Sequence, residues 1–308
     1  MKVLISGGEG FVGSHLKTEF WNNGYEVISC DLLKNEDAVY LDIMNQRMIR
    51  DVLNRFHPDV LVNLAGQANV GVSWSKPQLT IELNTIGFVN VLEAVKEVDP
   101  NIRVVAVGSS DQYGVLDQKG MDVKEDIETN PVTPYAISKQ AQELFARAYC
   151  KAYGMTIYMV RLFNLGGSGQ AKGFMISDFS SGIAEVEQGI SDHVSVGNLA
   201  CARDFTHVKD ACRAIRLVAE RGHTGEVYNI CSGKTYTAEE VLNKLLYLAK
   251  KEVRIEQDVK RMRPSDSPII CGNHEKVSSH TGWEPQFGID TILLESLEYW
   301  RMKIKEKK

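Results

Sequence analysis

The chain has 308 residues and a formal net charge of −5, and this length can bury one large core or two smaller ones. The acidic balance argues against a nucleic-acid partner, which usually requires a basic surface, and no apolar run approaches the ~20 residues of a membrane span. Six scattered cysteines without a CxxC pair, and no visible secretory signal, predict reduced thiols and a cytoplasmic location. The seven histidines lack ligand spacing, so we expect no metal site.

Three spaced glycines dominate the N-terminal part of the chain. A short apolar run leads into Gly7-x-x-Gly10-x-x-Gly13, and an amphipathic stretch follows. This pattern predicts a strand, a tight turn and a helix start, where glycine lets the backbone approach a pyrophosphate. The helix start adds free N–H groups and the positive end of the helix dipole. Asp31 closes the next apolar run about 20 residues later, where a carboxylate would bond the ribose hydroxyls of a dinucleotide.

The first half of the chain alternates strand-like and helix-like segments. This alternation predicts an α/β fold with a Rossmann-type doubly wound parallel sheet, helices on both faces and ligands at the carboxyl ends of the strands. Pro77 and Pro134 suit helix entrances. The expected strands are Val3–Ser6, Glu26–Cys30, Val60–Asn63 and Arg103–Val107, and the expected helices are Phe11–Asn22, Asn45–Phe56, Pro77–Val98 and Tyr135–Tyr153.

The pattern loosens in the second half, which predicts a smaller mixed α/β substrate domain. We expect residues 1–163, with 205–231 returning, to form the dinucleotide domain, and 164–204 with 232–308 to form the substrate domain. A capping-box signature at Thr237 opens a helix expected to run to Lys250. The other expected elements are the strands Thr156–Phe163 and Val227–Ile230, the glycine-rich loop Gly166–Gly173, and the helices Phe174–Gln188, Val208–Glu220 and Ile289–Lys303.

Tyr135 and Lys139 stand four residues apart, on one face of a predicted helix. A nearby cation favours the phenolate, so we expect Lys139 to lower the pKa of Tyr135. Such a tyrosine exchanges a proton with a carbonyl or alcohol oxygen while hydride moves at carbon. Ser109, at a strand end one loop earlier, can donate to the same oxygen, although a capped turn would explain it too. The same spacing recurs on helices that we expect to be solvated, in Tyr247 with Lys251 and Tyr299 with Lys303.

These motifs together resemble the extended short-chain dehydrogenase/reductases, from Val3 to about Trp300. The resemblance implies NAD(H) or NADP(H) as cofactor, with Lys139 also holding the nicotinamide ribose. It places Asn84 in the helix behind the site, where either a catalytic role or a buried structural hydrogen bond would explain this residue. The positions implied for the cofactor are Gly7, Gly10, Phe11, Val12, Gly13, Asp31, Asp42, Ile43, Leu64, Ala65, Gly66, Tyr135, Lys139 and Leu162.

Motifs in the second half resemble the branch of this family that handles GDP-mannose derivatives. They are Arg161–Asn164, Gly169-Gln170, Val196–Leu199, Arg203–Thr206 and Arg263–Asp266, in this order. Arginine forks suit a diphosphate, and the resemblance implies a GDP-sugar substrate. The substrate loop departs from the usual pattern at Leu165 and Ser168, which leaves a heptose or a 4-epimeric product open. The implied substrate residues are Ser110, Asn164, Lys172, Arg203, Arg263 and Asp266.

Asp111 favours a reductase over a dehydratase. The related dehydratases normally carry a glutamate there, and aspartate is shorter by roughly 1.5 Å. The expected reaction is NAD(P)H-dependent reduction of the C4 ketone of a GDP-4-keto-6-deoxyhexose, giving GDP-D-rhamnose or a close relative. Tyr135 would supply the proton, Ser109 would polarise the carbonyl, Lys139 would tune the phenol and Asp111 would orient the sugar. A nucleotide-sugar dehydratase or epimerase, and a non-catalytic dinucleotide-sensing regulator, are the alternatives.

The residues around Asp31 bear on the choice of cofactor, and two long helices bear on assembly. Asp31 would repel a 2′-phosphate and favours NADH, while Lys34 lies close enough to keep NADPH open. The family resemblance and two long apolar helices, Pro77–Val98 and Tyr135–Tyr153, predict a homodimer through a four-helix bundle.

Overall fold

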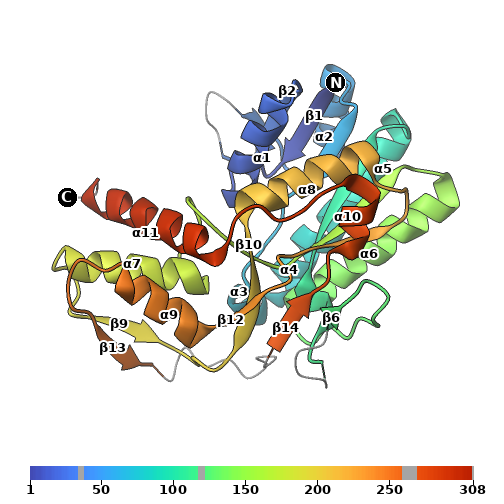
Figure 1. The fold of residues 1–308 in the computed structure, drawn as a ribbon. Helices are drawn as coiled ribbons and strands as arrows, with labels where there is room; N and C mark the ends of the chain where they lie inside the picture. Colours follow the sequence, from blue (N-terminus) through green and yellow to red (C-terminus); the bar gives the residue numbers. More distant parts are fainter. Residues whose placement is uncertain (34–37, 117–121, 259–268, 307–308) are drawn as a thin grey trace.

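The computed structural model describes residues 1–33, 38–116, 122–258 and 269–306, and its ribbon forms two bodies (Figure 1). The first is built on a seven-stranded sheet in the order β11-β7-β5-β4-β1-β2-β3, and every neighbouring pair is parallel. Its strands are β1 (Lys2–Ser6), β2 (Glu26–Asp31), β3 (Val39–Tyr40), β4 (Val60–Asn63), β5 (Arg103–Ser109), β7 (Ile157–Leu162) and β11 (Val227–Ile230).

Alternate side chains of these strands supply two separate apolar layers, one on each face of the sheet. Val3 and Ile5 pack with helices α1 (Phe11–Asn22) and α8 (Val208–Arg221). Leu4, between them, packs with α2 (Gln46–Phe56), α5 (Gly87–Val98) and α6 (Pro134–Tyr153) on the other face. This arrangement confirms the predicted doubly wound parallel sheet.

The predicted helices of the first half form, with one correction. Pro77 and Pro134 each stand at a helix start, and Thr133 caps α6 by accepting from the N–H of Ala136. The helix expected over Pro77–Val98 is not regular: α4 (Pro77–Ile81) runs into a π-helical turn, η1 (Glu82–Ile86), before α5 begins. Such π turns interrupt helices where a residue serves a specific contact. A short helix that we did not predict, α3 (Val70–Ser75), precedes α4.

The second body contains two smaller sheets and a separate apolar core. Strands β12 (Thr235–Thr237), β10 (Ala202–His207), β14 (Ile269–Gly272) and β6 (Asp122–Val123) form one sheet, with β8 (Asn164–Gly166) beside β10. Strands β9 (His193–Val196) and β13 (Arg254–Gln257) form the other. The core lies among α7 (Met175–Glu187), α9 (Ala238–Tyr247) and α11 (Ile289–Lys305). Helix α9 ends before the expected Lys250, and β6, β8, β9, β10, β12, β13 and β14 were not predicted.

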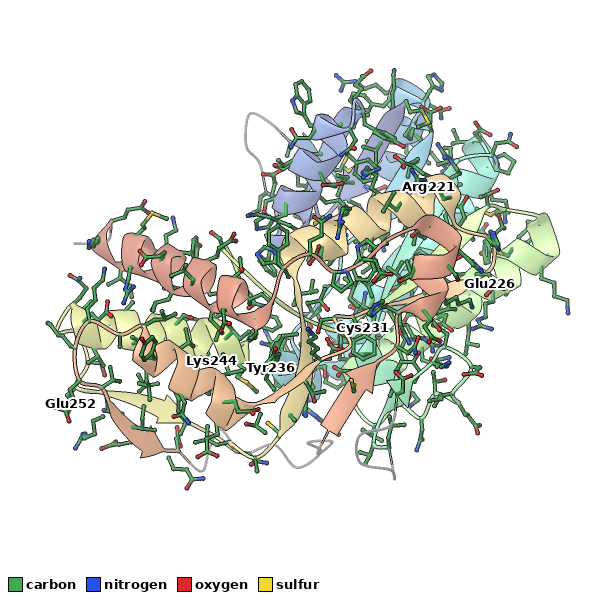
Figure 2. All side chains as sticks on the ribbon, in the orientation of Figure 1. Arg221, Glu226, Cys231, Tyr236, Lys244 and Glu252 are labelled. Atoms are coloured by element: carbon green, nitrogen blue, oxygen red, sulfur yellow. The ribbon has the colours of Figure 1, made fainter. Side chains whose placement is uncertain are left out.

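The chain crosses between the two bodies beside one buried carboxylate. Asp204 on β10 accepts from Ser232 N–H at 2.9 Å, Ser232 Oγ at 2.6 Å, Gly233 N–H at 2.9 Å and Gly272 N–H at 3.2 Å. Figure 2 shows the neighbouring Cys231 between the bodies, with Tyr236 and Lys244 on the second and Arg221 on the first. Asp204 therefore joins the segments that leave and enter the large sheet.

Helix α10 (Glu275–Thr281) packs against α8 and returns the C-terminal segment to the first body. All six cysteines are free, and four of them are buried. Within the described residues, no helix combines the length and apolar character needed to cross a membrane.

Candidate active site

The parallel sheet brings most predicted site residues to one edge. Gly7 follows β1, Asp31 ends β2, Asp42 and Ile43 follow β3, Leu64 follows β4, and Ser109 and Leu162 end β5 and β7. Carboxyl ends of parallel strands lie on the same side of a sheet, so residues far apart in sequence meet there. Ser109 and Leu162 are direct partners in the β5–β7 register.

The glycine turn forms a close-fitting backbone cradle. Gly7 has a φ of +76°, and a Cβ on it would lie 2.8 Å from Ala65 N; a Cβ on Gly13 would lie 2.3 Å from Gly7 O. Helix α1 starts at Gly10 with no side-chain cap and no acidic residue in its first turn. An uncapped helix start presents N–H groups to an anion, so these residues fit the pyrophosphate of a dinucleotide.

Asp31 is held in place at the end of β2. Its carboxylate accepts from Glu9 N–H at 3.0 Å and from Leu33 N–H at 3.1 Å. Glu9 lies in the glycine turn and contacts Lys17 Nζ and Ser29 Oγ, each at 2.6 Å. The position suits the adenosine ribose, as expected, while Lys34 lies outside the described residues.

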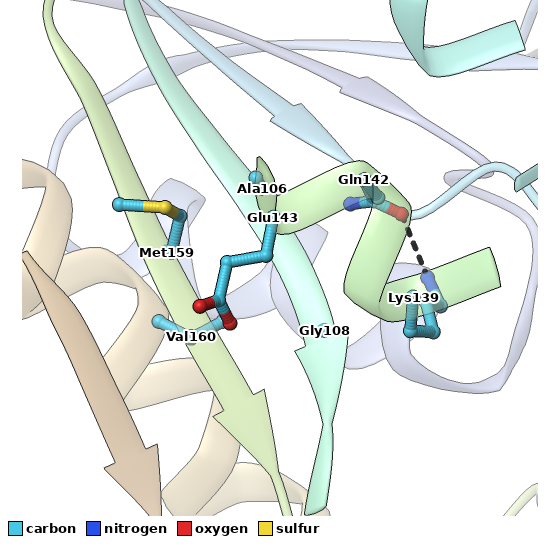
Figure 3. Close-up of a pocket in the computed structure, with 7 residues that line it drawn as sticks. All are labelled: Ala106, Gly108, Lys139, Gln142, Glu143, Met159 and Val160. Carbon is cyan, nitrogen blue, oxygen red and sulfur yellow. Dashed lines mark hydrogen bonds between the residues drawn. The ribbon is translucent and has the colours of Figure 1, made fainter. Parts of the chain in front are cut away.

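The catalytic candidates come from two adjacent elements. Ser109 ends β5 and caps the 3₁₀ turn η2 (Ser110–Tyr113), with its Oγ accepting from Asp111 N–H at 3.2 Å. Tyr135 and Lys139 lie on the first two turns of α6, and both are buried. Lys139 Nζ donates to Val107 O at 2.7 Å and to Gln142 Oε1 at 3.2 Å (Figure 3).

The electrostatics of Tyr135 differ from the expectation. Burial and the negative charge of Asp111 raise the pKa of the phenol, while a hydrogen bond with Ser109 lowers it. Burial also lowers the pKa of Lys139 to about 8. The prediction that Lys139 lowers the pKa of Tyr135 is therefore wrong for this structure. Desolvation exceeds any effect of the cation, whose bonds go to Val107 and Gln142.

Asn84 lies in the π turn η1 and acts as a structural link. Its Oδ1 accepts from Gln67 N–H at 2.7 Å, and its Nδ2 donates to Gln67 O and Ser138 Oγ, each at 2.9 Å. A Cβ on Gly66 would lie 2.5 Å from Asn84 Oδ1. Asn84 thus ties the loop after β4 to helix α6, in line with the buried hydrogen-bonding alternative.

The predicted substrate residues are more dispersed. Ser110 is buried in η2, next to Ser109. Asn164 on β8 is paired with Phe205 on β10, two residues after Arg203, and its Nδ2 donates to Asp204 O at 3.4 Å. Lys172 pairs with Glu185 at 2.6 Å and lies 5.7 Å from the centre of the Trp300 ring. Arg263 and Asp266 lie outside the described residues.

Sequence reasoning missed the residues that connect these elements. His15 on α1 bonds Ser168 O at 2.8 Å, which joins the glycine-rich loop to the dinucleotide helix. Gln112 and Glu143 form a buried link between η2 and α6 at 2.8 Å. Ser109 and Gln112 do form a capping box, Ser-x-x-Gln, which was a visible signal for Gln112. Glu143 had no such signal, because its partners lie on other elements.

Fold and site together define an extended short-chain dehydrogenase/reductase, which confirms the resemblance expected from the sequence. The chain belongs to the GDP-mannose 4,6-dehydratase family, whose model matches residues 4–296.

Relatives match along nearly the whole chain. GDP-6-deoxy-D-mannose reductase of Pseudomonas aeruginosa is 31% identical over 307 residues, covering 99% of each protein. GDP-6-deoxy-D-talose 4-dehydrogenase of Aggregatibacter actinomycetemcomitans is 28% identical, covering 96% of this chain and 97% of that protein. The structure of RMD from Pseudomonas aeruginosa complexed with NADPH has a TM-score of 0.89 and 28% identity, covering 98% and 99%. UDP-glucose 4-epimerase of Thermus thermophilus, in complex with NAD, has a TM-score of 0.87 and 26% identity, with the same coverage.

Proposed function

We propose that this protein reduces the C4 ketone of a GDP-4-keto-6-deoxyhexose to GDP-D-rhamnose or a close relative. The family and its relatives make the chain a nucleotide-sugar enzyme that works with NAD(H) or NADP(H). The proposal adds the direction of the reaction, the GDP carrier and the sugar.

The buried position of Tyr135, beside Ser109 and Asp111, carries the proposal. Because burial and Asp111 raise the pKa of its phenol, Tyr135 holds its proton at neutral pH. A carbonyl reduction needs such a donor, since the oxygen of the ketone gains negative charge as hydride reaches its carbon. Ser109 Oγ accepts from Asp111 N–H and lies beside the phenol of Tyr135, so its one O–H can donate to the ketone oxygen when the substrate lies there.

The remaining residues have distinct roles in this proposal. The reduced nicotinamide supplies the hydride. The N–H groups at the start of α1 hold the pyrophosphate, and the carboxylate of Asp31 accepts from ribose hydroxyls. Asp111 orients the sugar beside Tyr135. Asn164 on β8 and Arg203 on the neighbouring strand β10 are our candidates for the GDP part of the substrate, together with Ser110, Lys172, Arg263 and Asp266.

The test supplies purified protein with NADH or NADPH and GDP-4-keto-6-deoxymannose, and follows the absorbance of the reduced cofactor. We expect one cofactor oxidised per sugar reduced, faster with NADH because of Asp31, and chromatography of the product then identifies the C4 configuration. No oxidation would refute the proposal. Conversion of GDP-mannose to a keto sugar without net cofactor use would instead assign a dehydratase. In that enzyme Asp111 would serve as the base, and its charge already acts on the phenol of Tyr135.

We also propose a homodimer and a cytoplasmic location. Exposed apolar side chains gather on α4, η1 and α6, which contact one another, and they are Leu79, Ile81, Ile86, Ile137, Leu144 and Phe145. An apolar surface of this kind suits burial against a second copy. Light scattering should give twice the chain mass, and Leu144→Glu should yield a monomer. Six free cysteines suit a reducing compartment.

A further inference from the structure

Gln112 lies behind the catalytic turn and has no exposed surface. Its Oε1 accepts the backbone N–H of Ser109 at 2.9 Å. Its Nε2 donates to Glu143 Oε2 at 2.8 Å and to Gln140 Oε1 at 3.0 Å. One side chain therefore connects the end of β5 to helix α6.

Glu143 fixes which way the amide of Gln112 faces. An ionised carboxylate only accepts hydrogen bonds, and Glu143 receives two more from Arg161 on β7, at 2.9 and 2.8 Å. Although burial opposes it, Arg161 lowers the pKa of Glu143, which keeps that group ionised. The NH₂ group of Gln112 must then face Glu143, and its oxygen must face Ser109. Gly108 leaves room for this, since a Cβ there would lie 2.4 Å from Gln112 Oε1.

Helix α6 carries the catalytic candidates Tyr135 and Lys139 as well as Glu143, the hydrogen-bond partner of Gln112. Tyr135 and Lys139 lie on its first two turns, and Glu143 lies on the next turn, on the side of β7 (Figure 3). The chain from Arg161 through Glu143 and Gln112 to Ser109 thus sets the turn η2 against the helix that holds the phenol. A shift of η2 by a fraction of an ångström changes the distance from Ser109 and Asp111 to Tyr135.

We propose that Gln112 is a positioning residue for the carbonyl reduction, which holds the Ser109–Asp111 turn in register with Tyr135 by linking Ser109 N–H to Glu143. This inference rests on the proposed function. Gln112 touches neither cofactor nor substrate, and it acts through the placement of Ser109 and Asp111.

The first test replaces Gln112 with methionine, which has a similar length but makes none of the three hydrogen bonds. We expect kcat to fall about 10–100-fold, because displacement of a catalytic group is that costly, with KM for the cofactor and the sugar within about twofold. Gln140→Met is the matched control, because Gln140 contacts the same Nε2 from the half-buried face of α6. This control should keep the kcat of the wild type.

The second test uses Gln112→Glu. When protonated, the new carboxyl group can donate to Glu143 and accept from Ser109 N–H; when ionised, it repels Glu143. Relative to the wild type, kcat of this variant should therefore rise as the pH falls, while that of Gln112→Met should not. The charged and titratable groups around the position are Asp111 and Tyr113 on η2, Lys139, Glu143 and Arg147 on α6, and Arg161 on β7. These groups are the same in both variants, so the comparison isolates the new carboxyl.

A third readout does not depend on the substrate. Hydrogen exchange of the Ser109 amide should be much faster in Gln112→Met than in the wild type and in Gln140→Met. An unchanged kcat in Gln112→Met, with wild-type turnover established, would overturn the positioning role alone. A wild-type protein inactive on the keto sugar would refute the proposed function instead. A fall in kcat without faster exchange at Ser109 would also count against the proposed link.

Discussion

The two bodies hold their buried charges in different ways. In the first, Glu143 pairs with Arg161 only 18 residues away, on the helix and strand that follow one another in the chain. In the second, Glu187 pairs with Arg301 across 114 residues, and Asp204 reaches Ser232 and Gly272 across 28 and 68 residues. The ion pair behind the Ser109 turn thus closes a short loop, whereas the pair between Glu187 and Arg301 closes a much longer one with a larger closure cost. We therefore expect substitutions in the first body to lower kcat, and substitutions in the second body to lower the free energy of unfolding.

The largest expected effect belongs to the first body. Tyr135→Phe removes the proposed proton donor and should lower kcat about 10²–10⁴-fold, the usual contribution of general acid catalysis. The fold and the affinity for NADH should change little, because the phenol ring stays in place. Stopped-flow turnover and fluorescence titration of NADH measure the two quantities. Tyr247→Phe, at a residue 90% exposed with the same spacing to a lysine, is the control. Full activity of Tyr135→Phe would end the mechanism.

The next effect belongs to the second body. The carboxylate of Glu187 accepts from Arg301 Nε at 2.8 Å and from Lys250 N–H at 2.8 Å. Arg301→Met leaves this carboxylate buried without its guanidinium partner. Breaking a buried pair from one side costs about 3–5 kcal/mol of the free energy of unfolding. Urea unfolding followed by tryptophan fluorescence checks this value.

The dissociation constant of NADH, measured without urea, should stay the same in Arg301→Met, because α11 is not part of the dinucleotide cradle. Lys303→Met breaks the pair with Glu306 on the same helix, both exposed, and should shift the urea midpoint far less. If Arg301→Met is fully folded but no longer binds NADH, the expectation that the second body affects stability and not cofactor binding is wrong.

The sequence predicted the first body well because its signals are local. The glycines around Gly7, the proline before Tyr135 and the apolar runs of β1, β4 and β5 each act within a few residues. The spacing of Tyr135 and Lys139 also predicted that both lie on one helix face, whereas their burial is seen only in the structure. The parallel sheet with helices on both faces then followed from the alternation of strands and helices.

The second body was predicted less well, because its strands are short and find partners far along the chain. The residues of β9 pair with β13 about sixty positions later, and no periodicity in either segment reveals the partner. The bond from Lys139 to Val107 O, and the bonds of Asp204, likewise depend on tertiary contacts. The predicted domain boundaries, which place Asn164 and Arg203 in the substrate domain, stay a prediction.

The smallest effect tests the cost of placing a charge in the first body. Burial lowers the pKa of Lys139 to about 8 in the folded protein, below its ordinary value of 10.5. Between these values the unfolded chain binds more protons than the folded one, so the stability of the wild type rises with pH across this window. Below pH 8 the full penalty applies, on the order of 3 kcal/mol. Lys139→Met removes this penalty but leaves Gln142 Oε1 without its donor, and leaves Val107 O with the longer bond from Gln142 Nε2 at 3.3 Å. These losses cost roughly 1–2 kcal/mol.

The inactive Lys139→Met variant should therefore be about 1–2 kcal/mol more stable than the wild type at pH 7. This advantage should shrink or reverse at pH 10, where the wild-type lysine is mostly neutral in the folded state. Urea unfolding of both proteins at the two pH values measures it. Lys151→Met, at an exposed lysine of the same helix, should show no such dependence on pH. A variant less stable than the wild type at pH 7, with the same difference at pH 10, would mean that the hydrogen bonds of Lys139 outweigh its desolvation. In that case the buried charge of Lys139 would stabilise the first body and not strain it.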